Sequence, residues 1–202
     1  MVGIIDYGVG NLFSLVSSLA FLGIEARLVS DEKSIRESER IILPGVGAFG
    51  DAAKALAKNG LDEIIKSEAA NGKKLMGICL GMQLLFENGY EFGEHKGLGL
   101  IPGSVVSIKP LINENKIPHI GWNSLALSKN KGDIYKYTEN GEYVYFVHSF
   151  HAECPNEYIT ATTEYGGILT ASVQNGNVMG AQYHPEKSGD AGLKILKSFC
   201  EL

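Results

Sequence analysis

A cysteine lies at a strand-to-helix turn with the sequence Gly77-Ile78-Cys79-Leu80-Gly81. Small residues on both sides of a nucleophile permit the tight turn that exposes its side chain, and they let the following helix pack closely. The start of a helix stabilises a thiolate, and the backbone N–H of Leu80 is free to donate to an oxyanion. The pattern therefore indicates a nucleophile elbow, with a buried structural cysteine as the competing interpretation.

A nucleophilic thiol needs a base, and His184 has the most informative surroundings of the five histidines. It follows a predicted strand and precedes Pro185, which restricts it to extended backbone. Residues two apart in an extended chain point the same way, so we expect Glu186 beside the imidazole, orienting it and stabilising its charged form. Alone, this pattern is typical of a histidine at a strand end with a solvated glutamate. Combined with the elbow, it predicts a Cys79–His184–Glu186 triad.

The other histidines show no second chemical pattern. His148 and His151 are three apart in a predicted strand, so we expect them to face opposite sides of it. His95 and His119 have no partners at the spacing of metal ligands. The sequence therefore predicts no metal site.

A glycine motif, Gly45-x-Gly47-x-x-Gly50, follows a predicted strand and precedes a helix, as in dinucleotide-binding loops. The acidic residue expected after the next strand is replaced by Cys79, and Pro44 interrupts the entry to the motif, so we expect no nucleotide cofactor. Flexible glycine backbone can instead aim an N–H at a transition-state oxygen. The order of the elements predicts that this loop and Cys79 share the sheet edge at which α/β proteins bind ligands.

Strands and helices alternate in the first half of the chain, which predicts a parallel sheet covered on both faces. The expected strands there are 2–5, 24–29, 40–43 and 75–78, and the expected helices are 12–22, capped by Asn11, 52–58, 61–69 and 80–87. After Gly97 we expect strands at 105–108, 122–127, 143–150, 158–163, 168–173 and 178–183, with a hairpin turn at Asn175-Gly176. A last helix, 191–202, directs Leu193, Leu196 and Phe199 to the core. The chain is thus expected to form one α/β domain, residues 1–202, with an antiparallel extension.

Composition excludes several classes of protein. The chain has 202 residues, of which 45% are apolar and 20% charged, as in globular proteins. Its net charge of −5 and the lack of a basic run disfavour nucleic acid or an anionic membrane as partner. The sequence has no secretion signal and no long apolar run, and its three cysteines suit a reducing compartment, so we expect a cytoplasmic protein. Glycine accounts for 25 of the 202 residues, about 12%, compared with about 7% in an average protein. These glycines must serve particular backbone positions.

Together these motifs resemble the class I, triad-type glutamine amidotransferases. The elbow and His184-Pro185-Glu186 match that family's nucleophile and His-x-Glu motifs. Within the family, the chain is similar to the glutaminase subunits of imidazole glycerol phosphate synthases, which act in histidine biosynthesis. The segments that carry this closer likeness are 6–12, 43–49, 97–103, 118–123 and 184–188.

The resemblance implies a flavodoxin-like fold and the hydrolysis of glutamine to glutamate and ammonia without a cofactor. Cys79 would form a γ-glutamyl thioester, while His184 would protonate the leaving ammonia and then activate water. Leu80 and, after a backbone rearrangement, Val46 would supply oxyanion N–H groups from the elbow and from the loop that contains Gly47. The residues implied to line the glutamine pocket are Gln83, Gly47, His148, Ser149 and Phe150. Many relatives have tyrosine at the position of Phe150, so here a backbone contact is expected and a hydroxyl contact is not.

The resemblance also implies a partner, a (β/α)8-barrel cyclase subunit in a heterodimer. That subunit joins the ammonia to a phosphorylated nucleotide and makes imidazole glycerol phosphate and aminoimidazole carboxamide ribonucleotide. Trp122, Asn123 and Lys187 resemble residues that meet the cyclase, although spacing alone favours Trp122 as a core aromatic. Poor glutamine hydrolysis by the isolated chain is the corresponding expectation.

Three alternatives stay open from the sequence. A paralogous glutaminase subunit that feeds another synthase, such as one for surface-sugar amidination, would differ only in its partner. A peptidase or redox sensor with a cysteine elbow would not need His-Pro-Glu at this position. A non-catalytic binding subunit is disfavoured by the intact set of triad residue types.

Overall fold

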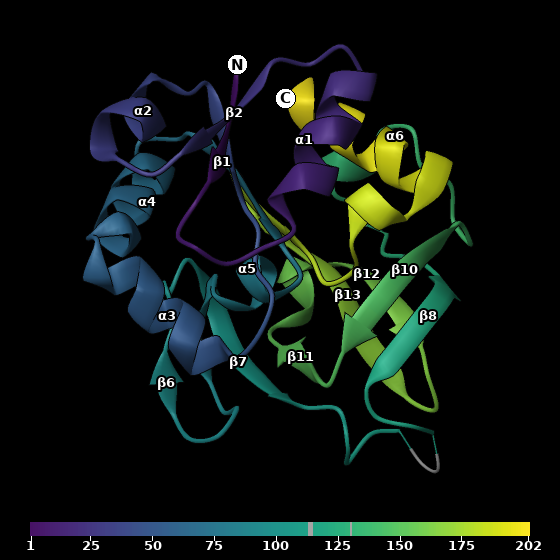
Figure 1. The fold of residues 1–202 in the computed structure, drawn as a ribbon. Coiled ribbons are helices and arrows are strands. Elements are labelled where there is room, and N and C mark those ends of the chain that lie inside the picture. The colour runs from purple at the N-terminus through teal and green to yellow at the C-terminus, as the bar shows by residue number, and fades with distance from the viewer. Residues whose placement is uncertain (113–114, 130) are drawn as a thin grey trace.

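The computed structural model describes residues 1–112, 115–129 and 131–202 and has an α/β architecture with one large and two small sheets (Figure 1). The helices are α1 (Leu12–Phe21), α2 (Glu32–Glu37), α3 (Phe49–Lys58), α4 (Leu61–Ala70), α5 (Leu80–Gln83) and α6 (Gly189–Cys200). The 3-10 helices are η1 (Asp133–Tyr135), η2 (Asn156–Tyr158) and η3 (Pro185–Lys187). The strands are β1 (Val2–Ile5), β2 (Ala26–Val29), β3 (Arg40–Leu43), β4 (Lys74–Ile78), β5 (Phe86–Gly89), β6 (His95–Lys96), β7 (Ile101–Ser107), β8 (His119–Ser124), β9 (Ala126–Leu127), β10 (Tyr143–His148), β11 (Phe150–Glu153), β12 (Ile159–Glu164), β13 (Ile168–Asn175) and β14 (Val178–Ala181).

The large sheet has the order β2-β1-β3-β4-β14-β13-β12-β9. Its first five strands are parallel, and the remaining three run antiparallel to their neighbours. In the centre, Leu43 pairs with Gly77 and Ala181 pairs with Ile78, so β3, β4 and β14 end at the same edge. The predicted mostly parallel sheet with an antiparallel extension is confirmed, and the edge that it defines carries the elbow.

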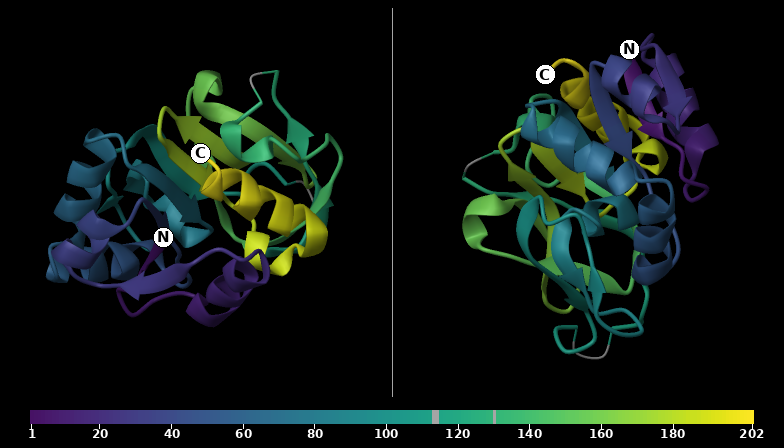
Figure 2. Two further views of the ribbon diagram at one scale, coloured as in Figure 1. Left: turned by 90° about the horizontal axis from the view of Figure 1, so that it is seen from above. Right: turned by 90° about the vertical axis from the view of Figure 1, so that its left-hand side faces the viewer.

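Helices cover both faces of the large sheet, with α2, α3 and α4 on one face and α1 and α6 on the other (Figures 1 and 2). Each strand alternates its side chains between the two faces. On β3, Ile41 and Leu43 belong to the hydrophobic cluster under α3 and α4, whereas Ile42 belongs to the cluster under α1 and α6. Both faces of the central strands are therefore buried, which explains their continuous apolar sequences.

Two small sheets complete the fold. One pairs β8 with β10, and the other has the order β11-β7-β5-β6. The strand predicted at 143–150 is divided, because the chain leaves β10 after His148 and enters β11, in the other small sheet, at Phe150. The strand predicted at 122–127 is also divided, into β8 and β9.

The helix predicted at 80–87 is wrong beyond Gln83. The carbonyl oxygens of Leu84 and Leu85 accept from the N–H groups of Leu98 and Leu100, each at 2.8 Å, so they are not available to continue the helix. The chain instead enters β5, where Phe86 pairs with Ile101. The sequence also did not predict α2, the short strand β6 or the 3-10 helices.

Several local predictions hold with changes. Asn11 precedes α1 as expected, but its side chain makes no capping hydrogen bond. The hairpin between β13 and β14 is present, with Asn175 paired to Val178. In α6, Leu193 was expected in the core but is only half-buried, and Ile195 is buried there instead. None of the helices in the part of the chain that the structure describes combines the length and apolar character needed to cross a membrane.

Candidate active site

Cys79 occupies a strained turn between β4 and α5. Its φ of 55° and ψ of −113° lie in a region that residues with a side chain rarely adopt. Its N–H donates to the carbonyl oxygen of Ala181 at 2.7 Å. A Cβ atom on Gly81 would lie 1.8 Å from the carbonyl oxygen of Leu43, and one on Gly77 would lie 2.6 Å from the carbonyl oxygen of Gly81. Both flanking glycines are thus required for α5 to approach the sheet, and the predicted elbow is present.

His184 and Glu186 lie beside each other at the end of β14. His184 Nδ1 is 2.8 Å from Glu186 Oε1, and each side chain is only 3% exposed. The predicted pairing is present, but its predicted geometric reason was wrong. The chain does not stay extended, because Pro185 begins the 3-10 helix η3, and this turn brings Glu186 back to the imidazole.

The imidazole of His184 is held in its charged form. Burial alone would lower the pKa of His184, but its interactions with the Cys79 and Glu186 side chains outweigh burial and raise that pKa to about 9. Its Nε2 atom is buried and makes no hydrogen bond with any described residue. His184 therefore carries a proton beside a thiol, and its Nε2 is not engaged by another hydrogen bond. Such a ring can transfer a proton at that thiol.

Gln182 is a site residue that the sequence did not reveal. It is fully buried, and its Nε2 lies 3.9 Å from Cys79 Sγ. Its Oε1 accepts from Gln83 Nε2 at 3.0 Å, and Gln83 Nε2 also lies 3.2 Å from the carbonyl oxygen of Phe150. The sequence could have indicated Gln182 only through its position directly after β14, the parallel strand beside β4.

The glycine loop after β3 lies at the same edge. Tyr7, from the segment after β1, donates its hydroxyl to the carbonyl oxygen of Pro44 at 2.8 Å. Burial, followed by the charge of Cys79, raises the pKa of Tyr7, so this hydroxyl remains a donor. Gly47 has a φ of +97°, and Val46 is exposed. Leu80 is the first residue of α5, so its N–H is one of those that have no partner within the helix.

A cavity of about 370 Å³ connects these groups. Its lining contains most of the predicted site residues, namely Cys79, His184, Leu80, Val46, Gly47, Gln83, His148, Ser149, Phe150 and Lys187. It also contains Glu91, Pro118 and Val147, which the sequence did not reveal. Glu91 is the only carboxylate among the described residues of this lining, and its Oε2 accepts from the N–H of Phe49 at 2.8 Å, at the start of α3.

The three residues expected to meet a partner come from two elements, and a Cβ atom on Gly189, two residues after Lys187, would lie 4.0 Å from the Trp122 ring. Lys187 lines the cavity, whereas Trp122 and Asn123 lie on β8. Trp122 is 55% exposed, so the core position favoured by its spacing is wrong. Its neighbours Ile120 on β8 and Tyr143 on β10 are also exposed, and together they give this small sheet an apolar outer surface.

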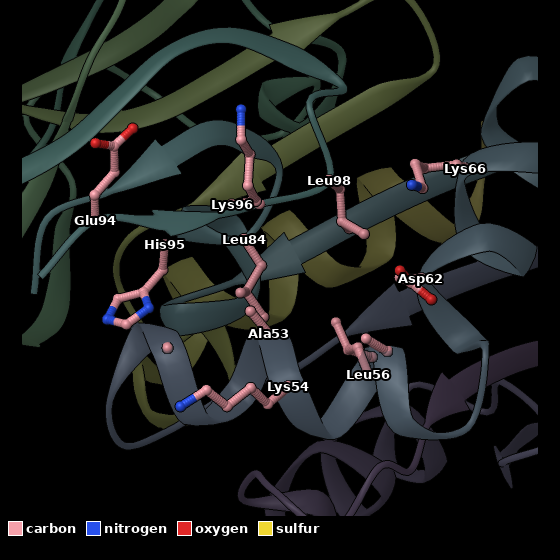
Figure 3. A pocket seen from close by; sticks show the side chains of 13 residues that line it. Ala53, Lys54, Leu56, Asp62, Lys66, Leu84, Glu94, His95, Lys96 and Leu98 are labelled. Atoms are coloured by element: carbon pink, nitrogen blue, oxygen red, sulfur yellow. The ribbon is translucent and has the colours of Figure 1, made fainter.

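A second cavity, of about 520 Å³, lies between α3, α4 and the segment around β6 (Figure 3). Lys54, Lys66 and Lys96 surround an apolar floor, and no cysteine or serine is among the lining residues. It therefore lacks a nucleophile of the kind that the elbow provides. Within the described ranges, no three His, Cys, Asp or Glu side chains are grouped so that they could hold a metal ion.

Comparison with known proteins agrees with this geometry. The family model for class-I glutamine amidotransferases matches residues 3–201. The chain is 49% identical to the "imidazole glycerol phosphate synthase subunit HisH" of Caldanaerobacter subterraneus, over all of this chain and 98% of that protein. It is 48% identical to the protein of that name from Listeria monocytogenes and 47% identical to the one from Wolinella succinogenes, with 96% and 100% of those proteins covered.

Solved structures share the fold. A crystal structure of a glutamine amidotransferase superimposes with a TM-score of 0.78 at 19% identity, over 99% of this chain and 97% of that one. A structure of PurLQS from Thermotoga maritima gives a TM-score of 0.78 at 24% identity, with the same coverage. These structures therefore place the chain among α/β proteins with a mostly parallel, helix-flanked sheet.

Proposed function

The chain belongs to the class-I glutamine amidotransferase family, and from this premise we propose that it is the glutaminase subunit of an imidazole glycerol phosphate synthase in histidine biosynthesis. The observation that supports this most strongly is the arrangement of Cys79, His184 and Glu186 at one sheet edge, beside a cavity large enough for an amino acid. Residues 1–202 would form one amidotransferase domain. Family membership argues against a peptidase or a redox sensor.

In the proposed reaction, the Cys79 thiolate attacks the side-chain amide carbon of glutamine. The carbonyl oxygen becomes an oxyanion, to which Leu80 at the start of α5 would donate its N–H. A second N–H would come from Val46, after the loop with Gly47 has rotated; the exposure of Val46 and the positive φ of Gly47 support this movement.

Collapse of the tetrahedral intermediate breaks the carbon–nitrogen bond. His184, charged by virtue of its raised pKa, would transfer a proton from Nε2 to the leaving nitrogen, so that ammonia departs and a thioester remains. The neutral imidazole would then take a proton from water, which attacks the thioester and releases glutamate. Glu186 would orient the ring through Nδ1 during both steps.

The cavity offers complementary groups for free glutamine. Gln83, His148, Ser149 and Phe150 form one wall. Glu91, which is the one carboxylate that the described part of the chain contributes to the lining, would pair with the α-ammonium group of the substrate. Burial raises the pKa of Cys154 and of Cys200 to about 11, so neither thiol competes with Cys79 as a nucleophile at neutral pH.

The ammonia would be used by a partner, a (β/α)8-barrel cyclase subunit. The relatives' printed name describes a subunit, and the exposed apolar surface at Trp122, Ile120 and Tyr143 is suited to a protein interface. Lys187 at the cavity would be near that interface. All three cysteines are free thiols, which supports a cytoplasmic location.

The test uses a glutamine-analogue electrophile and peptide mapping by mass spectrometry. We expect a single adduct on Cys79 and no ammonia release by Cys79→Ala. Cys154→Ala and Cys200→Ala are matched controls and should be labelled as the parent chain is. Labelling at Cys154 or Cys200 with Cys79 untouched would refute the mechanism. Strong glutamine hydrolysis that does not change on adding the cyclase and its ligand would refute the proposed partnership.

A further inference from the structure

His119 and His148 form a buried pair, of which only His148 belongs to the proposed glutamine pocket. They are directly opposite each other in the β8–β10 ladder, so their side chains share one face. His119 Nδ1 lies 3.0 Å from His148 Nε2. The ring of His119 is stacked between those of Phe146 and Tyr165, with centroids 4.8 and 4.0 Å away. The pair is therefore held in a defined orientation.

The partners at the two ends decide which nitrogens carry protons. The Phe150 carbonyl oxygen lies 2.8 Å from His148 Nδ1 and can only accept, so that nitrogen must donate. In a neutral ring Nε2 must then accept, which requires His119 to donate from Nδ1. His119 Nε2 in turn accepts from the side-chain amide of Asn123 at 3.4 Å.

Both imidazoles meet the requirement of being neutral. Burial lowers the pKa of His148 to about 3 and that of His119 to about 4, so neither ring is charged at neutral pH. Protonation of either ring would place two N–H groups against each other and interrupt this series of hydrogen bonds. The result is one directed series of hydrogen bonds from Asn123, through the two rings, to the Phe150 carbonyl.

This series ends on the wall of the proposed glutamine pocket. The Phe150 carbonyl accepts from both His148 and Gln83, and Ser149 and Phe150 are among the residues that line the cavity. The chain changes sheets at Ser149, and on the β11 side this backbone is held by the Ile108 N–H, which donates to the Ser149 carbonyl oxygen at 3.0 Å, and by the pairing of Phe150 with Ser107. The hydrogen bond from His148 to the Phe150 carbonyl ties this turn to β10 as well, and His119 holds the His148 ring.

We propose that His119 is a positioning residue for glutamine binding: its Nδ1–H fixes the His148 ring, and this ring fixes the Ser149–Phe150 backbone that the substrate contacts. The inference rests on the proposed glutaminase function. At its other end, the series is anchored to strand β8 through Asn123, which also donates to the Glu164 carbonyl at 2.8 Å.

The test compares three variants in the complex with the partner subunit. His119→Phe keeps the aromatic stack but removes the donor, and it should raise KM for glutamine about tenfold with kcat within about twofold, as expected for the loss of one buried hydrogen bond. His119→Asn keeps an N–H near the Nδ1 position and should restore KM to within about threefold of the parent value. Tyr165→Phe is the matched control, because it keeps the stack on His119 and loses only a bond to the Lys116 carbonyl.

A second measurement separates a positioning role from general damage. Iodoacetamide is small and can alkylate Cys79 without the contacts that glutamine makes with Ser149 and Phe150, so its rate should be the same in His119→Phe and the parent chain. An unchanged KM in His119→Phe would overturn the proposal, as would an equal rise in KM for Tyr165→Phe.

Nitrogen NMR of the unmodified chain tests the series without a variant. It should show neutral His148 and His119 rings at neutral pH, each with its proton on Nδ1. A proton on Nε2 of His148, or a charged ring, would overturn the proposal even if His119→Phe did not fold. A parent complex that does not hydrolyse glutamine would refute the proposed function instead and leave the NMR result unaffected.

Discussion

Three buried histidines should make the free energy of unfolding fall as the pH is lowered from about 7.5 to about 5.5. Burial lowers the pKa of His119 and of His151 to about 4, and that of His148 to about 3. In the unfolded chain each imidazole titrates near about 6.5. Within this pH interval these imidazoles bind protons in the unfolded chain but stay neutral in the folded protein. Acidification therefore favours the unfolded state.

His184 acts in the opposite direction. Its pKa in the folded protein is about 9, because the Cys79 and Glu186 side chains outweigh the effect of burial. Its stabilising contribution is fully present below about pH 6.5 and is lost as the pH rises through about 9. Acidification from about pH 7.5 to about pH 5.5 therefore regains part of this contribution.

The size of the net effect follows from the pKa differences. Over this interval each imidazole changes the free energy of unfolding by about 1.4 kcal/mol, the equivalent of about one pKa unit. Three residues lose this amount and one regains it, so the net loss is about 3 kcal/mol. That is a substantial part of the roughly 5–15 kcal/mol that stabilises a typical domain.

Urea unfolding at the two pH values measures this loss directly. His151→Phe removes one of the three destabilising titrations, so its loss on acidification should be about half that of the parent chain. Cys79→Ala removes a cause of the raised pKa of His184, so its loss should be larger than that of the parent. Equal free energies of unfolding at the two pH values, or the same pH dependence in His151→Phe and the parent, would refute the reasoning.

Three further predictions concern the site. Gly81→Ala should lower the thermal midpoint and abolish ammonia release, because its Cβ would lie 1.8 Å from the Leu43 carbonyl oxygen; calorimetry and an ammonia assay measure both. Tyr7→Phe should cost about 1 kcal/mol in urea unfolding and lower kcat more than it affects KM, since the Pro44 loop loses its hydroxyl donor. Glu91→Gln should raise KM for glutamine about tenfold or more, while its amide oxygen still caps α3; an unchanged KM would exclude Glu91 from substrate binding.

The central strands could be predicted from the sequence because their signal is local. The strands 2–5 and 40–43 were located to the residue, since each is a short apolar run between polar residues or turns. Burial on both faces makes such a run continuous, and it needs no knowledge of its neighbours to be recognised. The helix at 61–69 was similarly clear and extends by only one residue.

The small sheets could not be predicted in this way, because their strands are defined by distant partners. Residues 84–89 have an apolar pattern compatible with a helix, and only pairing with β7 selects a strand there. The break at Ser149 depends on the two sheets to which its neighbours belong. The apolar side chain of Trp122 suggested burial, whereas its place on the outer face of a two-stranded sheet leaves it exposed.

The site shows the same division between local and distant information. Cys79, with its flanking glycines, and His184, with Glu186 two residues later, carry their context in adjacent positions, so spacing could indicate them. Gln182 and Glu91 could not be identified by spacing, because each reaches the cavity or the thiol from an element whose placement depends on the assembled sheets.

The four buried histidines show why residue type alone cannot assign a role. His184 and His148 are almost equally buried, and burial disfavours the charged ring in both. In His184 the carboxylate and the thiol outweigh burial and raise the pKa, whereas in His148 burial outweighs the hydrogen bond to the Phe150 carbonyl and lowers the pKa. Of the two partners of His184, Glu186 follows from the adjacent sequence, whereas Cys79 is brought near His184 by the parallel pairing of β4 with β14. The donor to His148 follows from the β8–β10 register, which places His119 opposite His148, so a shift of one residue in that register would remove the donor.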